Sequence, residues 1–400
     1  MYKKTIGDIL PQVRGKSVLV RVDFNVPIEN GRVIEDTRIS ASLPTIRKLQ
    51  ESGARVTLMS HLGRPKNGPA PEFSLAPVAR HLATLSKQDV TFATDCIGPA
   101  AAAVAGALRP GQVCLLENLR FHAEEEKNDP EFARQLAVWG DIYVNDAFGS
   151  AHRAHASTEG VTHFIDTCVA GYLMERELDY LGRLLVDPKR PFVAILGGAK
   201  ISGKLEVIEN LLKFVDVFLI GGGMAFTFLR AQGHQIGRSL VENDLIETAG
   251  RILRDAGAKG TAFLLPVDCV AAPDLSGTGA PTTVGAARIP TDLAGFDIGP
   301  RTIQSFASRL KTAGTIFWNG PMGVFEKPPF DAGTVALAQT VAEATDHGSV
   351  SVVGGGDSVA AVHQAGVAER ISHISTGGGA SLEFLEGRIL PGVAALDDRE

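Results

Sequence analysis

The sequence predicts an α/β fold in which parallel sheets are covered by helices, arranged in two domains. In both halves of the 400-residue chain, short apolar runs alternate with segments of helical periodicity, which is the pattern of parallel strands joined by crossover helices. Each apolar run ends in a polar or glycine-rich loop. The 44% hydrophobic content is enough for large cores, and the length predicts about two to three domains.

Strand candidates occur at regular intervals along both halves. Those in the first half are residues 16–20, 55–59, 112–116 and 141–144, and each runs into a polar segment. Those in the second half end in runs of glycine. They are residues 191–196, 215–220, 350–353 and the segment from Ile374 onward. We therefore expect two Rossmann-like domains, one for each half.

The first strand ends in a polar trio that is suited to binding an anion. Arg21, Asp23 and Asn25 alternate with apolar residues, so the three polar side chains leave the strand on one side. A solvated strand edge is the other interpretation of one such segment. The anion-binding interpretation gains weight because the pattern recurs along the chain.

Four further arginines occupy comparable positions after strand candidates or near them: Arg38, Arg64, Arg120 and Arg153. In open parallel sheets, ligands bind beyond the carboxyl ends of the strands, so these arginines are expected to converge. Guanidinium groups bind carboxylate and phosphate in a bidentate manner, which favours a small polyanion as the ligand.

Glycine-rich loops follow the strands of the second half. They comprise residues 197–200, 221–223, 354–358 and 377–379. Glycine between a strand and a helix lets backbone N–H groups approach phosphate oxygens, and the helix N-terminus adds partial positive charge. One such loop can reflect a tight turn alone, whereas four in one half favour a nucleotide site.

Two familiar glycine motifs do not fit. Residues 198–204 have the spacing of a P-loop, but Leu205 stands where a Ser or Thr hydroxyl should bind Mg²⁺. Residues 221–226 lack the third glycine of the dinucleotide fingerprint, which argues against a nicotinamide dehydrogenase. The glycine loops therefore belong to another type of nucleotide site.

Composition excludes several classes of function. The net charge of −6 argues against a nucleic-acid-binding protein. The four cysteines are far apart and predict reduced thiols in a cytoplasmic protein. The N-terminal residues have no apolar signal region, and the most hydrophobic stretch, 215–229, is interrupted by Asp216 and glycines, so we expect neither secretion nor a membrane span.

The domain boundary is expected near residues 172–185. Leucines recur there at helical spacing, and Asp187-Pro188 ends the run. We therefore expect a connecting helix with hinges at its ends.

Taken in order, the motifs resemble those of the phosphoglycerate kinase family from one end of the chain to the other. Ser358 stands where many members carry Thr, and it still supplies a hydroxyl. The matching segments are 21–27, 61–65, 117–121, 145–148, 151–155, 197–204, 318–326, 354–358 and 375–380.

This resemblance implies reversible phosphoryl transfer between 1,3-bisphosphoglycerate and ADP, giving 3-phosphoglycerate and ATP. Residues 1–171 would bind 3-phosphoglycerate, residues 172–186 would form the connector, and residues 187–386 would bind the nucleotide with Mg²⁺. Residues 387–400 would pack back onto the first domain. The resemblance also implies a cytoplasmic monomer, and it leaves the physiological direction of the reaction open.

Site roles follow from the same resemblance. Arg38, Lys200 and Gly378 would act on the transferred group. A second set would bind the phosphoglycerate: Arg21, Val22, Asp23, Asn25, Arg38, His61, Leu62, Gly63, Arg64, Arg120, His152 and Arg153. A third set would bind the nucleotide, with Asp357 near its Mg²⁺: Gly198, Ala199, Lys200, Lys204, Gly223, Asn319, Pro321, Val324, Glu326, Gly355, Gly356, Asp357 and Ser358.

Other hypotheses remain. A catalytically silent metabolite- or nucleotide-binding protein on the same fold would tend to lose Lys200, Asp357 or the loop at Gly377, and this chain retains all three. An unrelated P-loop ATPase is disfavoured by Leu205. His152 and His155 suggest a metal pair, but two histidines with no third ligand nearby more often pack or form hydrogen bonds.

Overall fold

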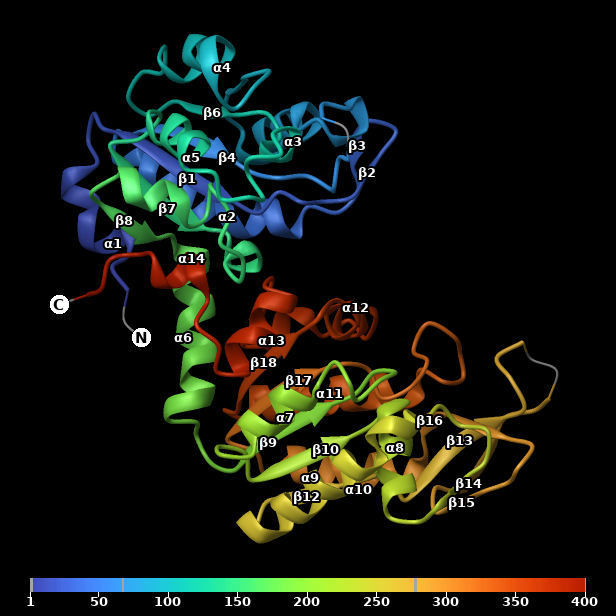
Figure 1. Cartoon of the computed structure of the whole chain (residues 1–400). Coiled ribbons are helices and arrows are strands. Elements are labelled where there is room, and N and C mark those ends of the chain that lie inside the picture. The colour runs from blue at the N-terminus through green and yellow to red at the C-terminus, as the bar shows by residue number, and fades with distance from the viewer. Residues whose placement is uncertain (1–2, 67, 277–278, 400) are drawn as a thin grey trace. The chain divides into compact units, whose positions relative to one another are not determined.

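The computed structural model describes residues 3–66, 68–276 and 279–399. The chain divides into two compact units (Figure 1). Unit 1 comprises Met1–Asp179 together with Arg388–Glu400, and unit 2 comprises Tyr180–Gly387.

Unit 1 contains a six-stranded sheet in which every pairing is parallel. Its central strands are mostly apolar on both faces, as in parallel sheets that helices cover. Val20, for example, is fully buried between Leu58 and Val144 on the neighbouring strands. In spatial order the strands are β5 (Val90–Phe92), β6 (Val113–Leu115), β4 (Arg55–Met59), β1 (Ser17–Val22), β7 (Ile142–Asp146) and β8 (Cys168–Ala170).

The helices of unit 1 bury one face each. In α2 (Thr37–Glu51), Ile39, Leu43 and Ile46 are buried at helical spacing, and Arg38 lies in the first turn. The other elements of the unit include α1 (Ile6–Ile9), the hairpin β2 (Ile28–Glu29) and β3 (Arg32–Val33), α3 (Ala76–Ser86), α4 (Gly98–Ala105) and α5 (Pro130–Ala137).

Unit 2 contains a second six-stranded parallel sheet. Trp318 lies fully buried in its core together with Phe306 and Leu337. In spatial order the strands are β12 (Ala262–Leu264), β10 (Val217–Ile220), β9 (Phe192–Leu196), β17 (Thr315–Asn319), β18 (Val350–Gly354) and β19 (His373–Ile374). The helices are α7 (Leu205–Leu211), α8 (Met224–Ala231), α9 (Ile246–Lys259), α10 (Pro300–Leu310), α11 (Ala332–Asp346), α12 (Gly356–Gln364) and α13 (Gly379–Leu385). The two parallel sheets confirm the predicted fold class.

Unit 2 also carries strands that the sequence analysis did not predict. An antiparallel sheet has the order β14 (Thr282–Gly285), β13 (Asp268–Ala272) and β16 (Ala294–Ile298), and its register shifts between Val270 and Ala271. A two-stranded sheet joins β11 (Gln235–Ile236) to β15 (Arg288–Ile289). A separate small core that includes Phe226 and Ile236 packs beneath them.

The connecting helix is α6 (Tyr172–Val186), and the chain crosses between the units a second time near Gly387. The C-terminal residues belong to unit 1. Gly392 N donates to Ala151 O at 2.9 Å, and Asp397 N donates to Cys168 O at 2.8 Å. The short helix α14 (Pro391–Ala394) lies in this segment.

Cys96, Cys114, Cys168 and Cys269 are free and buried. Among the residues that the structure describes, no helix combines the length and the apolar character that crossing a membrane requires.

Candidate functional site

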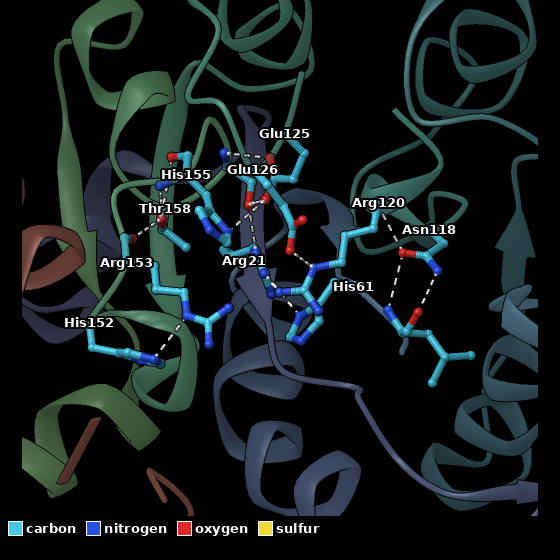
Figure 2. Close-up of polar contacts among 12 residues, drawn as sticks. Arg21, His61, Asn118, Arg120, Glu125, Glu126, His152, Arg153, His155 and Thr158 are labelled. Carbon is cyan, nitrogen blue, oxygen red and sulfur yellow. Dashed lines mark hydrogen bonds and ion pairs between the residues drawn. The ribbon is translucent and has the colours of Figure 1, made fainter. Parts of the chain in front are cut away.

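The topology of unit 1 brings the predicted anion-binding segments to one edge of its sheet. Strands β6, β4, β1 and β7 are neighbours. Arg21 lies at the carboxyl end of β1, and the segments after β6, β4 and β7 carry Arg120, His61 and Arg153. Figure 2 shows these side chains around Arg21. Segments more than a hundred residues apart in the sequence thus form one polar cluster.

Arg21 lies deepest in this cluster, with 1% of its surface exposed. Its Nε donates to Ser157 Oγ at 2.8 Å, and its Nη1 donates to the carbonyl oxygen of Val22 at 2.6 Å. Its Nη2 lies 3.1 Å from His61 Nδ1, which accepts. These bonds fix the plane of the guanidinium group.

Asp23, Asn25 and Arg38 form a second group of contacts. Arg38 Nη1 lies 3.3 Å from Asp23 Oδ1 and donates to Asn25 O at 3.1 Å. Asn25 Oδ1 accepts from Gly63 N at 2.9 Å, so this loop is tied to the one after β4. The Arg38 side chain remains about one-third exposed and can reach a ligand.

The loop after β4 is held by its neighbours. The side-chain amide of Asn118 binds both Leu62 N and Leu62 O, and Arg120 Nη1 donates to Gly63 O at 2.7 Å. Gly63 has φ +60°, and a Cβ there would lie 2.5 Å from the Phe73 ring. The loop therefore needs glycine at this position. Arg64, the next residue, is exposed.

Burial and the neighbouring arginines favour the neutral form of two histidines in the cluster, His61 and His155. Burial, followed by the charge of Arg21, holds the pKa of His61 well below its usual value. Burial and the same arginine lower the pKa of His155 to about 4. His152 accepts a hydrogen bond from the exposed Arg153 at 3.1 Å. The arginines are therefore the main source of positive charge in the cluster.

In unit 2, the glycine loops after β9 and β10 interlock with the loop after β17. Gly197 N donates to Asn319 O at 3.0 Å, and Gly198 N donates to Pro321 O at 2.8 Å. Gly198 has φ +100°, and a Cβ on Gly223 would lie 2.7 Å from Ala199 O. Glycine is thus required where these backbones approach one another.

These loops border a cavity of about 630 Å³ within unit 2, a volume suited to a small-molecule ligand. Seven of the residues predicted for nucleotide binding line it: Gly198, Ala199, Gly223, Pro321, Val324, Glu326 and Asp357. The sequence analysis missed the rest of the lining: Gly222, Arg238, Leu240, Pro273, Asp274, Leu275, Ala294, Gly295, Phe296 and Gly323.

The missed residues differ in how much signal they carry. Gly222 and Gly323 lie inside motifs that the sequence analysis recognised. Phe296 lies on β16, and Pro273 directly follows β13. Their position at the cavity depends on the antiparallel sheet, which no local sequence pattern predicted.

Other predicted nucleotide-site residues support the loops from beneath. Asn319 is 2% exposed, and its Nδ2 donates to Gly354 O at 2.8 Å. Ser358 Oγ accepts from Gly320 N at 2.5 Å. Gly355 has φ +90° and precedes α12, which begins at Gly356. These contacts tie the loops after β17 and β18 together.

Lys200, Lys204 and Asp357 are the charged residues that the sequence predicts for the phosphates and their Mg²⁺, and Arg238, Asp274 and Glu326 also line the cavity. Lys200 is exposed in the loop after β9. Lys204 is half-buried immediately before α7, and burial lowers its pKa to about 8, while the charge of Asp357 acts in the opposite direction. Asp357 is exposed at the start of α12. One carboxylate at this position suits Mg²⁺ that is held mainly by nucleotide phosphates.

Gly378 has φ +52° and immediately precedes α13. The turn before it is held by Ser375, whose Oγ accepts from Gly377 N at 3.1 Å and lies 2.6 Å from Ser381 Oγ. An L-residue at position 378 would be strained, so the backbone there can present its N–H groups only with glycine.

Among the described residues, one cluster of side chains has the spacing of a metal site. The ligand atoms of Asp95, Cys96 and His122 lie within 4.8 Å of one another. His122 Nε2 lies 2.7 Å from Asp95 Oδ1, and the same oxygen accepts from Cys96 N at 2.7 Å. These contacts satisfy the polar atoms locally, and we assign the group no ligand.

This chain is similar over nearly its whole length to known proteins. The family model described as phosphoglycerate kinase matches residues 6–388. The phosphoglycerate kinases of Prosthecochloris aestuarii and Chlorobaculum tepidum are 57% and 55% identical over 399 residues, and each alignment covers 100% of both sequences. The structure of phosphoglycerate kinase from Coxiella burnetii is 43% identical with a TM-score of 0.90, and the alignment covers 98% of each chain. The enzyme from Pyrococcus horikoshii OT3 is 35% identical with a TM-score of 0.82, over 96% of each chain. This chain belongs to the phosphoglycerate kinase family.

Proposed function

We propose that this protein catalyses reversible phosphoryl transfer between 1,3-bisphosphoglycerate and ADP, giving 3-phosphoglycerate and ATP. One observation carries the proposal beyond family membership. A cluster of arginines stands at the carboxyl edge of one parallel sheet, and a glycine-lined cavity with Lys204 and Asp357 nearby stands in the other unit. Such a pair of sites suits one anionic substrate and one nucleotide.

In unit 1, the arginines would bind the phosphoglycerate. Arg21, Arg64, Arg120 and Arg153 provide the positive charge, and neutral His61 provides hydrogen bonding. Asp23 and Asn25 would hydrogen-bond the hydroxyl and carboxyl end of the substrate. The backbone of Val22, Leu62 and Gly63, and the side chain of His152, would complete this wall.

In unit 2, the cavity would hold the nucleotide. Gly198, Ala199, Gly223 and Pro321 leave the backbone accessible, and Val324 offers apolar contact to the nucleoside. Glu326 would accept hydrogen bonds from the ribose hydroxyls, and Lys204 would bind the phosphates. Asn319, Ser358, Gly355 and Gly356 would hold the loops in place. Asp357 would lie beside the Mg²⁺, which, when bound with the nucleotide, supplies positive charge to the phosphate oxygens.

The chemistry needs charge neutralisation and alignment. Both nucleophiles, a carboxylate and a terminal phosphate, are deprotonated at neutral pH, so the residues need not remove a proton. Charge on the transferred group resides on its equatorial oxygens in flight. Arg38 and Lys200 would neutralise that charge, and the backbone around Gly378 would donate N–H groups to it.

We propose that residues 1–171 with 387–400 act as the phosphoglycerate domain, 172–186 as the connector and 187–386 as the nucleotide domain. In-line transfer needs the reacting atoms within about 3–3.5 Å of each other, which implies closure about hinges at the ends of α6. We further propose a monomer, as the family resemblance implies, in the cytoplasm, where the four dispersed free cysteines would stay reduced. Light scattering in solution checks the oligomeric state.

The alternative function is a silent binding protein on this fold. Retention of Lys200, Asp357 and the Gly378 loop argues against it. The test is an assay with purified protein, MgADP and 1,3-bisphosphoglycerate. We expect ATP and 3-phosphoglycerate in equal amounts. Binding of both ligands without turnover would establish the silent protein, and release of inorganic phosphate without ATP would identify a hydrolase.

A further inference from the structure

The guanidinium of Arg21 is held from behind by a buried hydroxyl. Its Nε donates its only hydrogen to Ser157 Oγ at 2.8 Å. Nη1 donates one bond to Val22 O, and Nη2 donates one to His61 Nδ1. Each of these two nitrogens carries a second N–H. The contact between Nε and Ser157 therefore determines in which direction the remaining N–H groups of Arg21 can face an acidic ligand.

Ser157 is in turn held in place by hydrogen bonds to a buried carboxylate, Glu125. A hydroxyl has one proton, and Ser157 donates it to Glu125 Oε1 at 2.6 Å, so its lone pairs are left to accept from Arg21. Ser157 N donates to the other oxygen, Glu125 Oε2, at 3.0 Å. Arg21, Ser157 and Glu125 thus form a relay in which Arg21 donates to Ser157 and Ser157 donates to Glu125. Figure 2 labels its two ends, Arg21 and Glu125.

The relay is rigid because its members are buried and tied to the backbone. Ser157 and Glu125 are both 0% exposed. Tyr143 Oη donates to Ser157 O at 2.8 Å, and Ala156 N donates to Glu125 O at 3.0 Å. Burial raises the pKa of Glu125 above its usual value, although the charge of Arg21 and the two bonds from Ser157 act in the opposite direction and favour the ionised form.

We propose that Ser157 and Glu125 are positioning residues that hold Arg21 in the orientation that receives the acidic substrate of unit 1. The proposal rests on the proposed function, because it takes Arg21 to bind phosphoglycerate. Arginine side chains have several rotatable bonds, and a guanidinium that is oriented before binding loses less freedom when the ligand arrives. Neither residue needs to touch the substrate.

Ser157→Ala removes the link and leaves both charges in place. We expect the Kd of 3-phosphoglycerate, measured by titration calorimetry, to rise about tenfold, as for loss of a hydrogen bond to a charged group. The KM of MgADP and the kcat at saturation should stay within about twofold of the parent. Glu124→Gln is the matched control, since Glu124 is the exposed neighbour of Glu125 and its side chain lies outside the relay.

A double-mutant cycle separates positioning from general damage to the fold. Lysine has no Nε–H in this place, so Ser157→Ala should change kcat/KM for phosphoglycerate less than about twofold when Arg21→Lys is already present. An equal loss in both backgrounds, or an unchanged Kd in the single variant, overturns the proposal. If Ser157→Ala does not fold, Glu125→Gln, which keeps the volume and one acceptor, takes its place with the same expected direction. Failure of the parent protein to make ATP would instead refute the proposed function.

Discussion

At the scale of single residues, Lys200 is the exposed cation that follows the cavity-lining Gly198 and Ala199. An exposed ammonium contributes little to folding. In the proposed mechanism it meets charge that is concentrated mainly in the transition state, so its contribution should be to kcat.

Lys200→Ala should lower kcat by on the order of 10²- to 10³-fold and change both KM values by only a few fold. Steady-state kinetics in both directions measure this. Lys213→Ala is the control, because Lys213 is also exposed in unit 2 and contacts Asn210. A kcat within about threefold of the parent would remove Lys200 from the catalytic group.

Lys204 predicts a dependence on pH. Burial lowers its pKa to about 8, so Lys204 loses its charge as the pH rises through that value, whereas an ordinary lysine stays charged. We expect kcat/KM for MgADP to fall above about pH 8, since this parameter reports groups of the free enzyme. Lys204→Arg keeps the charge and should remove the fall. A profile that is flat to about pH 9.5 in the parent would contradict the assignment.

At the scale of elements, Asp146 links the end of β7 to the start of α6. Its Oδ1 accepts from Leu173 N at 2.9 Å and from Met174 N at 3.3 Å, which caps two N–H groups of the first turn. Tyr172 N is bound by Thr45 Oγ1 at 2.9 Å. The connecting helix is thus anchored to the sheet of unit 1 by a buried carboxyl group.

Burial raises the pKa of Asp146 to about 7, so the folded protein holds a proton that the unfolded chain releases near pH 4. The unfolding free energy should therefore fall as the pH rises from about 4 to about 7, by up to about 4 kcal/mol for this group. Asp146→Asn keeps an acceptor for the helix and should flatten this fall. Burial also raises the pKa of Asp297 to about 7, so the Asp146→Asn protein should keep the part of the pH dependence that is due to Asp297.

Denaturant unfolding at about pH 5 and about pH 7.5 measures the difference. Asp89→Asn, a substitution of an exposed carboxylate, is the control and should leave the slope unchanged. An Asp146→Asn protein with the full pH dependence of the parent would show that Asp146 does not hold the proton.

The elements also show which features of the site can be predicted from the sequence. Parallel strands end at one edge, so motifs after β1, β4, β6 and β7 predict a shared site without any knowledge of contacts. The partner of Arg21 is different, because Ser157 lies 136 positions along the chain and resembles any other serine in the sequence. Likewise, the neutral state of His61 depends on burial, and the wall containing Phe296 depends on an antiparallel sheet. Local patterns contain neither kind of information.

At the scale of the whole molecule, the two proposed sites belong to separate compact units that share the 15-residue helix α6, about 22 Å long. Each proposed site is built within its own unit, and the proposed direct transfer takes place when the two units bring the two ligands together and exclude water from the acyl phosphate.

Small-angle scattering tests the movement. The radius of gyration should fall when Mg-nucleotide and 3-phosphoglycerate are both bound, and fall less with either alone. An unchanged radius in a ternary complex, with binding shown independently, would mean that closure is unnecessary.

The stereochemical course at phosphorus tests most directly whether the two sites act together in one step. With a phosphoryl group made chiral by oxygen isotopes, a single in-line transfer between the carboxylate of phosphoglycerate and the terminal phosphate of ADP inverts the configuration. We expect inversion in the ATP that the protein produces. Retention would reveal two successive transfers through a phosphorylated residue, and would contradict direct transfer assisted by Arg38, Lys200 and the Gly378 loop.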